Sequence, residues 1–173
     1  MPNHVTNKLT VRKGTQKILP ALYSATIEYN SIDEKLYDIL RNFSFNKIIP
    51  QGDHDNQWRW DNWGTRTDAY VIDDPDEWQN KDETINLINS FGQFETAWSP
   101  PLQVIRKLQK MFPDYSFALD YIDEQFMFCG TMDIKGEDNH TEEEKDLRYY
   151  GAYLLQYSHK DLDEFFESCE ENV

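Results

Sequence analysis

SPPLQVIRKLQKMFPDYSFALDYIDEQFMFCGTMDI, residues 99–134, joins one helical pattern to two strand patterns. Ser99 and the prolines that follow it are typical of a helix start. The helix is expected to end at Pro113. Its apolar residues recur at helical spacing and form one stripe, made of Leu102, Ile105, Leu108, Met111 and Phe112.

The second half of this stretch predicts a hairpin. Residues 115–122 and 125–134 alternate as strands do, and Asp123-Glu124 between them is a turn signal. A tight connection requires that the two strands run antiparallel.

Strand and helix patterns also alternate through the rest of the chain. Asp33 is a suitable N-cap for a helix over 33–42. The pairs Thr141/Glu144 and Ser158/Asp161 are signals for two C-terminal helices. Further predictions are strands or extended segments at 4–11, 43–50, 65–72 and 84–97, a helix at 15–25, and a Trp-rich loop at 51–63. The order predicts an α+β fold, with a mainly antiparallel sheet and helices on one face.

Length and composition favour a soluble, folded protein. The 173 residues suit one domain with an appendage, and 39% of them are hydrophobic. The N-terminus lacks the apolar region of a signal peptide, and no apolar run reaches membrane-spanning length. Cys129 and Cys169 form no CxxC motif. We therefore expect a cytoplasmic protein that does not contact membranes, with Cys129 as a packed thiol.

The net charge of −15 is concentrated near the C-terminus. Residues 136–173 hold twelve acidic and three basic side chains, which leaves that segment at −9. This argues against direct binding to nucleic acid, which needs basic residues. The acidic charge favours solubility alone, a basic protein partner, or imitation of a polyanion. The candidate partner-binding residues are Glu137, Asp138, Glu142, Glu143, Glu144, Asp161, Asp163, Glu164, Glu167, Glu170 and Glu171.

Catalytic, cofactor and metal signatures are absent from the sequence. There is no GxxxxGK[ST], GxGxxG, GxSxG or HExxH motif. Asp53-His54-Asp55 offers metal-ligand atoms, but three consecutive residues rarely close a site. We expect no enzyme activity, no cofactor and no metal site.

Tryptophan residues gather in the middle of the chain, and two interpretations remain open. Trp58 and Trp60 would point the same way on an extended segment and stack a base, a sugar or a ligand cation. Alternatively, the rings anchor a small core. The candidate ligand-binding residues are Trp58, Trp60, Trp63, Arg66, Asp68 and Trp98.

An ordered set of motifs resembles a known family. The motifs are MPN (1–3), TNKLTV (6–11), FSFNKIIP (43–50), WGT (63–65), DA (68–69) and FETAWSPP (94–101), followed by the helix to Pro113 and the strand 115–121. Together they resemble the ferredoxin-like family typified by the F-plasmid protein YubB and its phage relatives. Relatives often carry a basic and then an aromatic residue after Gly-Thr. Arg66 fits this pattern, whereas Thr67 departs from it.

The resemblance implies a ferredoxin-like α+β body over residues 1–135 and an origin in a phage, prophage or plasmid. It supplies no catalytic activity, and two cysteines cannot ligate an iron–sulfur cluster. Residues 136–173 are expected to form an acidic helical region packed on the body.

Three functions fit these observations. The first is a non-enzymatic accessory protein that binds a basic partner through its acidic surface. That partner would be a nucleic-acid-binding or defence protein, and the accessory protein would act as a DNA mimic or counter-defence inhibitor. The second is a small-ligand or nucleotide-binding module, or a cryptic enzyme, that uses the Trp-rich loop. The third is a packaging accessory that self-associates, and the sequence leaves its oligomeric state open.

Overall fold

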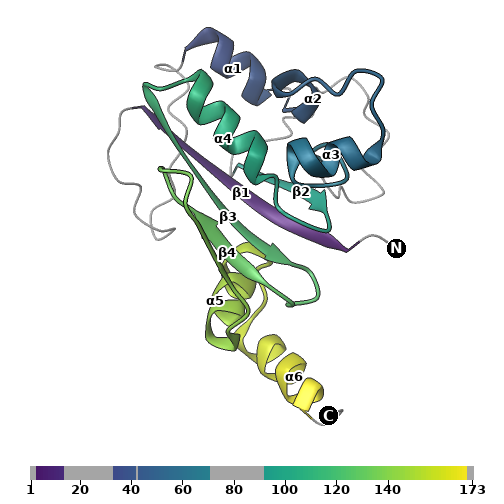
Figure 1. Cartoon of the computed structure of the whole chain (residues 1–173). Coiled ribbons are helices and arrows are strands. Elements are labelled where there is room, and N and C mark those ends of the chain that lie inside the picture. Colours follow the sequence, from purple (N-terminus) through teal and green to yellow (C-terminus); the bar gives the residue numbers. More distant parts are fainter. Residues whose placement is uncertain (1–2, 14–32, 42, 71–91, 171–173) are drawn as a thin grey trace, which may run out of the picture.

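The computed structural model describes residues 3–13, 33–41, 43–70 and 92–170 (Figure 1). The helix predicted at 15–25, most of the strand predicted at 84–97, and Glu171 lie outside these residues.

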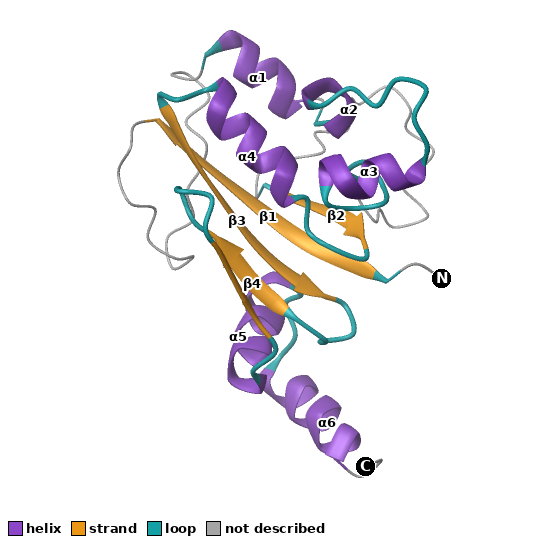
Figure 2. Ribbon diagram, viewed as in Figure 1, coloured by secondary structure: helices purple, strands orange, loops and turns teal. Residues whose placement is uncertain are grey.

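Five strands form a single antiparallel sheet in the order β2-β1-β3-β4-β5 (Figure 2). They are β1 (His4–Lys13), β2 (Gln93–Ala97), β3 (Tyr115–Asp123), β4 (Cys129–Met132) and β5 (Asp138–Thr141). The predicted α+β class with an antiparallel sheet is therefore confirmed.

Four helices lie over one face of the sheet (Figure 2). They are α1 (Glu34–Arg41), α2 (Phe45–Ile48), α3 (Asn56–Trp63) and α4 (Leu102–Met111). The core beneath them includes Val5, Leu9 and Val11 of β1. From α4 it includes Ile105 and Leu108.

The C-terminal segment adds β5 at the edge of the sheet and α5 (Glu144–Leu154) on the opposite face. A second apolar cluster there joins Ile122 and Cys129 of the sheet to Leu147 and Leu154 of α5. The last helix, α6 (His159–Glu170), inserts Leu162 into this cluster, where the side chain is 2% exposed. Through Leu162 the C-terminal helix therefore packs on the body.

Two of the predicted caps are confirmed. The Asp33 carboxylate accepts hydrogen bonds from the backbone N–H groups of Lys35 and Leu36. Ser158 and Asp161 bond reciprocally at the start of α6, where the Asp161 N–H donates to the Ser158 hydroxyl.

Several local predictions are wrong. Residues 45–48 of the extended segment form α2, and residues 56–63 of the predicted loop form α3. Residues 65–70 form an isolated bridge at Tyr70 instead of a strand. Thr141 belongs to β5, and α5 begins at Glu144 without a side-chain cap. For α2 and α3 the apolar pattern is too short to distinguish helix from strand, so the capping contacts of Asp68 and Asp55 decide.

Gly151 of α5 allows a close helix approach that provides a test of this packing. A Cβ at this position would lie 2.4 Å from Phe126 Cε1 and 3.0 Å from Leu162 Cδ2. Helix propensity alone predicts that Gly151→Ala stabilises the protein by about 1 kcal/mol. We expect the opposite, a loss of about 1–3 kcal/mol from overpacking. Urea unfolding measures the difference, and a gain in stability would contradict this packing.

Candidate functional site

The six candidate ligand-binding residues separate into a packed group and an exposed group. Trp63 is 1% exposed, and its indole N–H donates to the Ile49 carbonyl at 2.9 Å. Trp58 is half-buried and meets Trp63 edge-on, with ring centroids 6.0 Å apart. Both rings therefore belong to the core, as the second interpretation of the tryptophans predicts.

Because α3 is a helix, Trp58 and Trp60 do not point the same way. Asp55 caps this helix by accepting from the Trp58 N–H, and Gly64 ends it in the left-handed region at φ 80°. Residues two apart on a helix point to different sides. The extended platform predicted for Trp58 and Trp60 is thus wrong.

Asp68 caps the start of α2 with its side chain. Its carboxylate accepts from the Ser44 hydroxyl at 2.7 Å and from the Phe45 N–H at 2.5 Å. It therefore satisfies the free N–H groups at the start of α2.

The remaining three residues, Trp60, Arg66 and Trp98, lie together on the surface, and we call them the Trp–Arg patch. The Arg66 guanidinium lies 5.5 Å from the centroid of the Trp60 ring and 6.0 Å from that of Trp98. The two tryptophans are 40% and 44% exposed. Within the described part of the chain, no carboxylate forms an ion pair with Arg66.

Hydrogen bonds on both sides of Trp98 fix its backbone. The Thr65 hydroxyl donates to the Ala97 carbonyl at 2.8 Å, and the Ala97 N–H donates to the Thr67 hydroxyl at 3.1 Å. The Ser99 hydroxyl donates to the carbonyl of Gly64. Trp98 itself has φ 76°, an unfavourable conformation for a bulky residue that costs about 1–3 kcal/mol.

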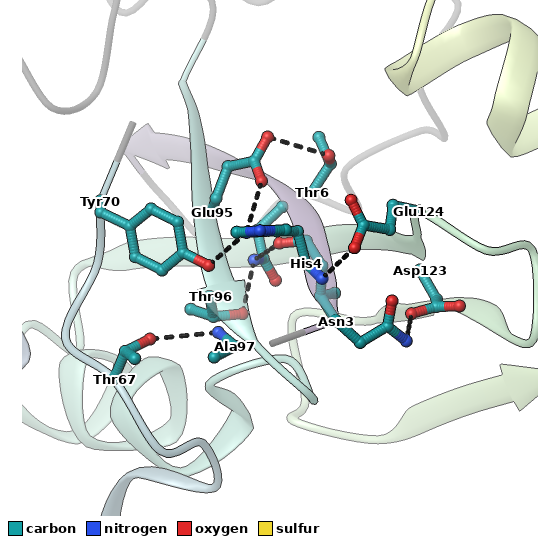
Figure 3. Close-up of polar contacts among 12 residues, drawn as sticks. Asn3, His4, Thr6, Thr67, Tyr70, Glu95, Thr96, Ala97, Asp123 and Glu124 are labelled. Carbon is teal, nitrogen blue, oxygen red and sulfur yellow. Dashed lines mark hydrogen bonds and ion pairs between the residues drawn. The ribbon is translucent and has the colours of Figure 1, made fainter. Parts of the chain in front are cut away.

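A second cluster of polar side chains joins β1, β2 and the segment ending at Tyr70 (Figure 3). His4 Nδ1 lies 2.6 Å from the Tyr70 hydroxyl and 3.9 Å from Glu95 Oε2. The Thr6 hydroxyl donates to Glu95 Oε1 at 3.3 Å, and the His4 N–H donates to Glu124. The sequence does not predict this cluster, because no spacing signal connects residues so far apart in the chain.

Burial sets the electrostatics of this cluster. It raises the pKa of Glu95, with the neighbouring His4 acting in the opposite direction. Burial, together with Glu95 and Glu124, raises the pKa of Tyr70 to about 12. Glu95 Oε2 is buried without a hydrogen-bond partner in the described structure. A tyrosine that holds its proton this firmly is suited to hydrogen bonding rather than to nucleophilic attack.

The nine described side chains of the predicted acidic surface are all exposed. They are Glu137, Asp138, Glu142, Glu143, Glu144, Asp161, Asp163, Glu164 and Glu167. Glu170 is the last residue of α6. Three basic residues of this segment already form ion pairs with it: Lys145 with Glu143, Arg148 with Glu144 and Asp163, and Lys160 with Glu164.

The remaining candidates for metal binding or thiol chemistry are packed against other side chains or lack further ligands. Among the described residues, no three His, Cys, Asp or Glu side chains are placed to hold a metal ion. His54 stacks on Trp58 with centroids 5.3 Å apart. Cys129 is buried, and desolvation raises the pKa of its thiol to about 12, which suits a packed side chain.

No described helix combines the length and apolar character that crossing a membrane requires.

The model of a family described as "Ferredoxin-like domain in Api92-like protein" matches residues 76–163. This range continues past residue 135, through β5 and α5, into α6. No curated protein and no solved structure matches the chain.

The unpartnered oxygen of Glu95 yields a pH-dependent prediction. Folding raises the pKa of the Glu95 carboxyl above its ordinary value of 4.5. Below pH 4.5 the carboxyl is protonated in both the folded and the unfolded chain, so it does not change the free energy of unfolding. As the pH rises through the higher pKa of the folded state, the buried charge lowers the free energy of unfolding. Glu95→Gln keeps an acceptor for Thr6 and removes the buried charge. We expect the variant to equal the wild type near pH 4 and to exceed it by about 1 kcal/mol at pH 7.

Urea unfolding at both pH values measures this difference. Glu167→Gln on the exposed surface of α6 is the matched control and should change the free energy of unfolding by less than about 0.5 kcal/mol. If Glu95→Gln instead lowers the free energy of unfolding at pH 7 and leaves it unchanged at pH 4, the Glu95 charge stabilises the fold and the prediction is wrong.

Proposed function

This chain belongs to the family of ferredoxin-like domains in Api92-like proteins, and we propose that it is a non-enzymatic binding protein with a basic protein partner. The partner contacts the acidic surface of residues 137–171. The resemblance to YubB-like proteins supports a further part of the proposal, that the chain comes from a phage or plasmid and acts in the host cytoplasm.

One observation carries this proposal: the excess acidic charge of the C-terminal segment is not neutralised by its neighbours. The three basic residues of the segment are already engaged in ion pairs with four of its acids. Glu137 and Glu167 are exposed, and neither forms an ion pair with a basic side chain among the described residues. Such an excess attracts a basic partner and accelerates association with it.

A partner that normally binds nucleic acid fits this chemistry best. Carboxylates on β5, α5 and α6 present negative charge in place of phosphates, which follow each other about every 1.7 Å along duplex DNA. The protein would then compete with DNA for the basic surface of its partner. A defence protein of the host is the kind of partner that a mobile element gains from blocking.

Charge neutralisation of the C-terminal surface tests the proposal. Partners are recovered from host lysate at low salt and identified, and their affinity is then measured with purified proteins. We expect Glu137→Gln, Glu142→Gln, Glu164→Gln and Glu167→Gln together to weaken binding by at least about tenfold, because long-range attraction is lost. High salt should weaken wild-type binding similarly.

The matched control removes four exposed charges that lie outside the C-terminal segment, in Glu34→Gln, Asp38→Asn, Asp53→Asn and Asp114→Asn. It changes the net charge equally and should retain most of the affinity. Equal losses in both variants would reduce the effect to net charge alone. If no basic partner is recovered, the proposal is refuted. If a basic partner is recovered but duplex DNA does not compete with the protein for it, the proposed DNA mimicry is refuted.

A further inference from the structure

We propose that the Trp–Arg patch is a second protein-docking site, which binds an acidic side chain of a partner flanked by apolar residues. The inference does not depend on the acidic surface. It rests on the contacts of Trp60, Arg66 and Trp98, and it names a partner surface of the opposite charge.

The composition of the patch is that of an interface centre. Tryptophan and arginine are the residues that most often dominate binding energy at protein interfaces. Here two indoles with 40% and 44% of their surface exposed flank one guanidinium. Three chain segments bring them together: α3, the turn after it, and the loop after β2. Packing within a single helix therefore does not account for the arrangement.

The charge of the ligand follows from the position of Arg66. Its guanidinium already lies over both indole rings, so it takes the place that a ligand cation would occupy. The five N–H donors of a guanidinium lie in its plane and match the two oxygens of a carboxylate. In a chain with 32 acidic residues, Arg66 has no carboxylate partner among those described. An acidic group from another molecule supplies it.

A carboxylate fits better than a polyphosphate. The net charge of −15 repels a nucleic acid backbone strongly, whereas a single acidic side chain carries one charge and brings apolar neighbours that cover the indoles. The patch residues come from α3, the turn after it and the loop after β2, and Figure 1 shows α3 and β2 well apart from α6. The patch and the part of the acidic surface on α6 can therefore be occupied independently.

The backbone around Trp98 supports a binding role. Hydrogen bonds from Thr65 and Ser99 on either side hold the loop, and Trp98 keeps its unfavourable φ of 76° within it. Strain of this kind persists where the surroundings enforce it, and it is enriched at ligand sites. It presents the indole in a fixed orientation, which reduces the entropy lost on binding.

The test uses the intact chain and two synthetic peptides, acetyl-Phe-Asp-Phe-amide and acetyl-Phe-Asn-Phe-amide. Nuclear magnetic resonance follows the indole N–H signals and the Arg66 side-chain signals. We expect the Asp peptide to shift the signals of Trp60, Arg66 and Trp98 and to bind at least about tenfold more tightly than the Asn peptide. The signal of buried Trp63 should stay in place and report an intact fold.

Variants separate binding from folding. Arg66→Gln should abolish the preference for the Asp peptide, and Arg66→Lys should recover only part of it because the planar fork is lost. Lys107→Gln removes one positive charge from the exposed side of α4 and should bind normally. Trp98→Gly and Trp98→Ala should both lose binding, while the Gly variant melts at the higher temperature because glycine tolerates this φ.

Three outcomes would overturn the inference. The first is the absence of shifts at Arg66 with millimolar Asp peptide. The second is equal binding of the two peptides. The third is tighter binding of phenyl phosphate than of the Asp peptide, which would assign the patch to a phosphorylated ligand.

Discussion

The pairing of β1 on both of its edges is the constraint from which the rest of the structure follows. All ten of its residues lie in the sheet, nine of them paired with β3 from Val5–Asp123 to Lys13–Tyr115, and five paired with β2. This register brings the start of the chain beside segments about ninety and one hundred and twenty positions later. It assigns Val5, Leu9 and Val11 to the helix-covered core and leaves His4, Thr6 and Lys8 on the opposite face. A shift of one residue would exchange the two faces and bury the charged side chains.

The loop that follows β2 depends on this pairing as well. Asn7, which is fully buried, donates to the Thr96 hydroxyl, and that hydroxyl donates to the Ser99 carbonyl. The motifs WGT and FETAWSPP, which are far apart in sequence, meet here through the bonds of Gly64 with Ser99 and Thr65 with Ala97. Two of the motifs that suggested a family, WGT and FETAWSPP, thus form the two sides of one junction. Its described hydrogen bonds hold the Trp–Arg patch in place.

Sequence patterns predicted the elements that carry long apolar periods. The helix after Ser99, the strand of Tyr115 and the docking of Leu162 are correct, because repeated apolar spacing reports which face is buried. The hairpin after β3 is correct in kind but has a longer turn, since β4 begins only at Cys129. The short helices α2 and α3 were missed because tertiary capping by Asp68 and local capping by Asp55 outweigh their weak apolar pattern.

The candidate site was predicted only in part, for a related reason. Arg66 and Trp98 were recognised as residue types suited to binding, but their contact depends on the junction between two distant segments. The same applies to the His4, Tyr70 and Glu95 cluster, where a strand pairing and an isolated bridge create the neighbourhood. Residue identity indicates which side chains have useful chemistry, whereas register determines which of them meet.

The edge strand β5 has a further consequence for the behaviour of the protein in a crowded cell. A free sheet edge invites another chain to add a strand, and natural proteins discourage this with short, charged edges. β5 has four residues, begins with Asp138, and leads after two residues into α5. Its side chains are polar and largely exposed. β5 therefore protects the sheet from edge-to-edge aggregation. A truncation before Asp138 would leave the backbone N–H and C=O groups of β4 unpaired at a new sheet edge.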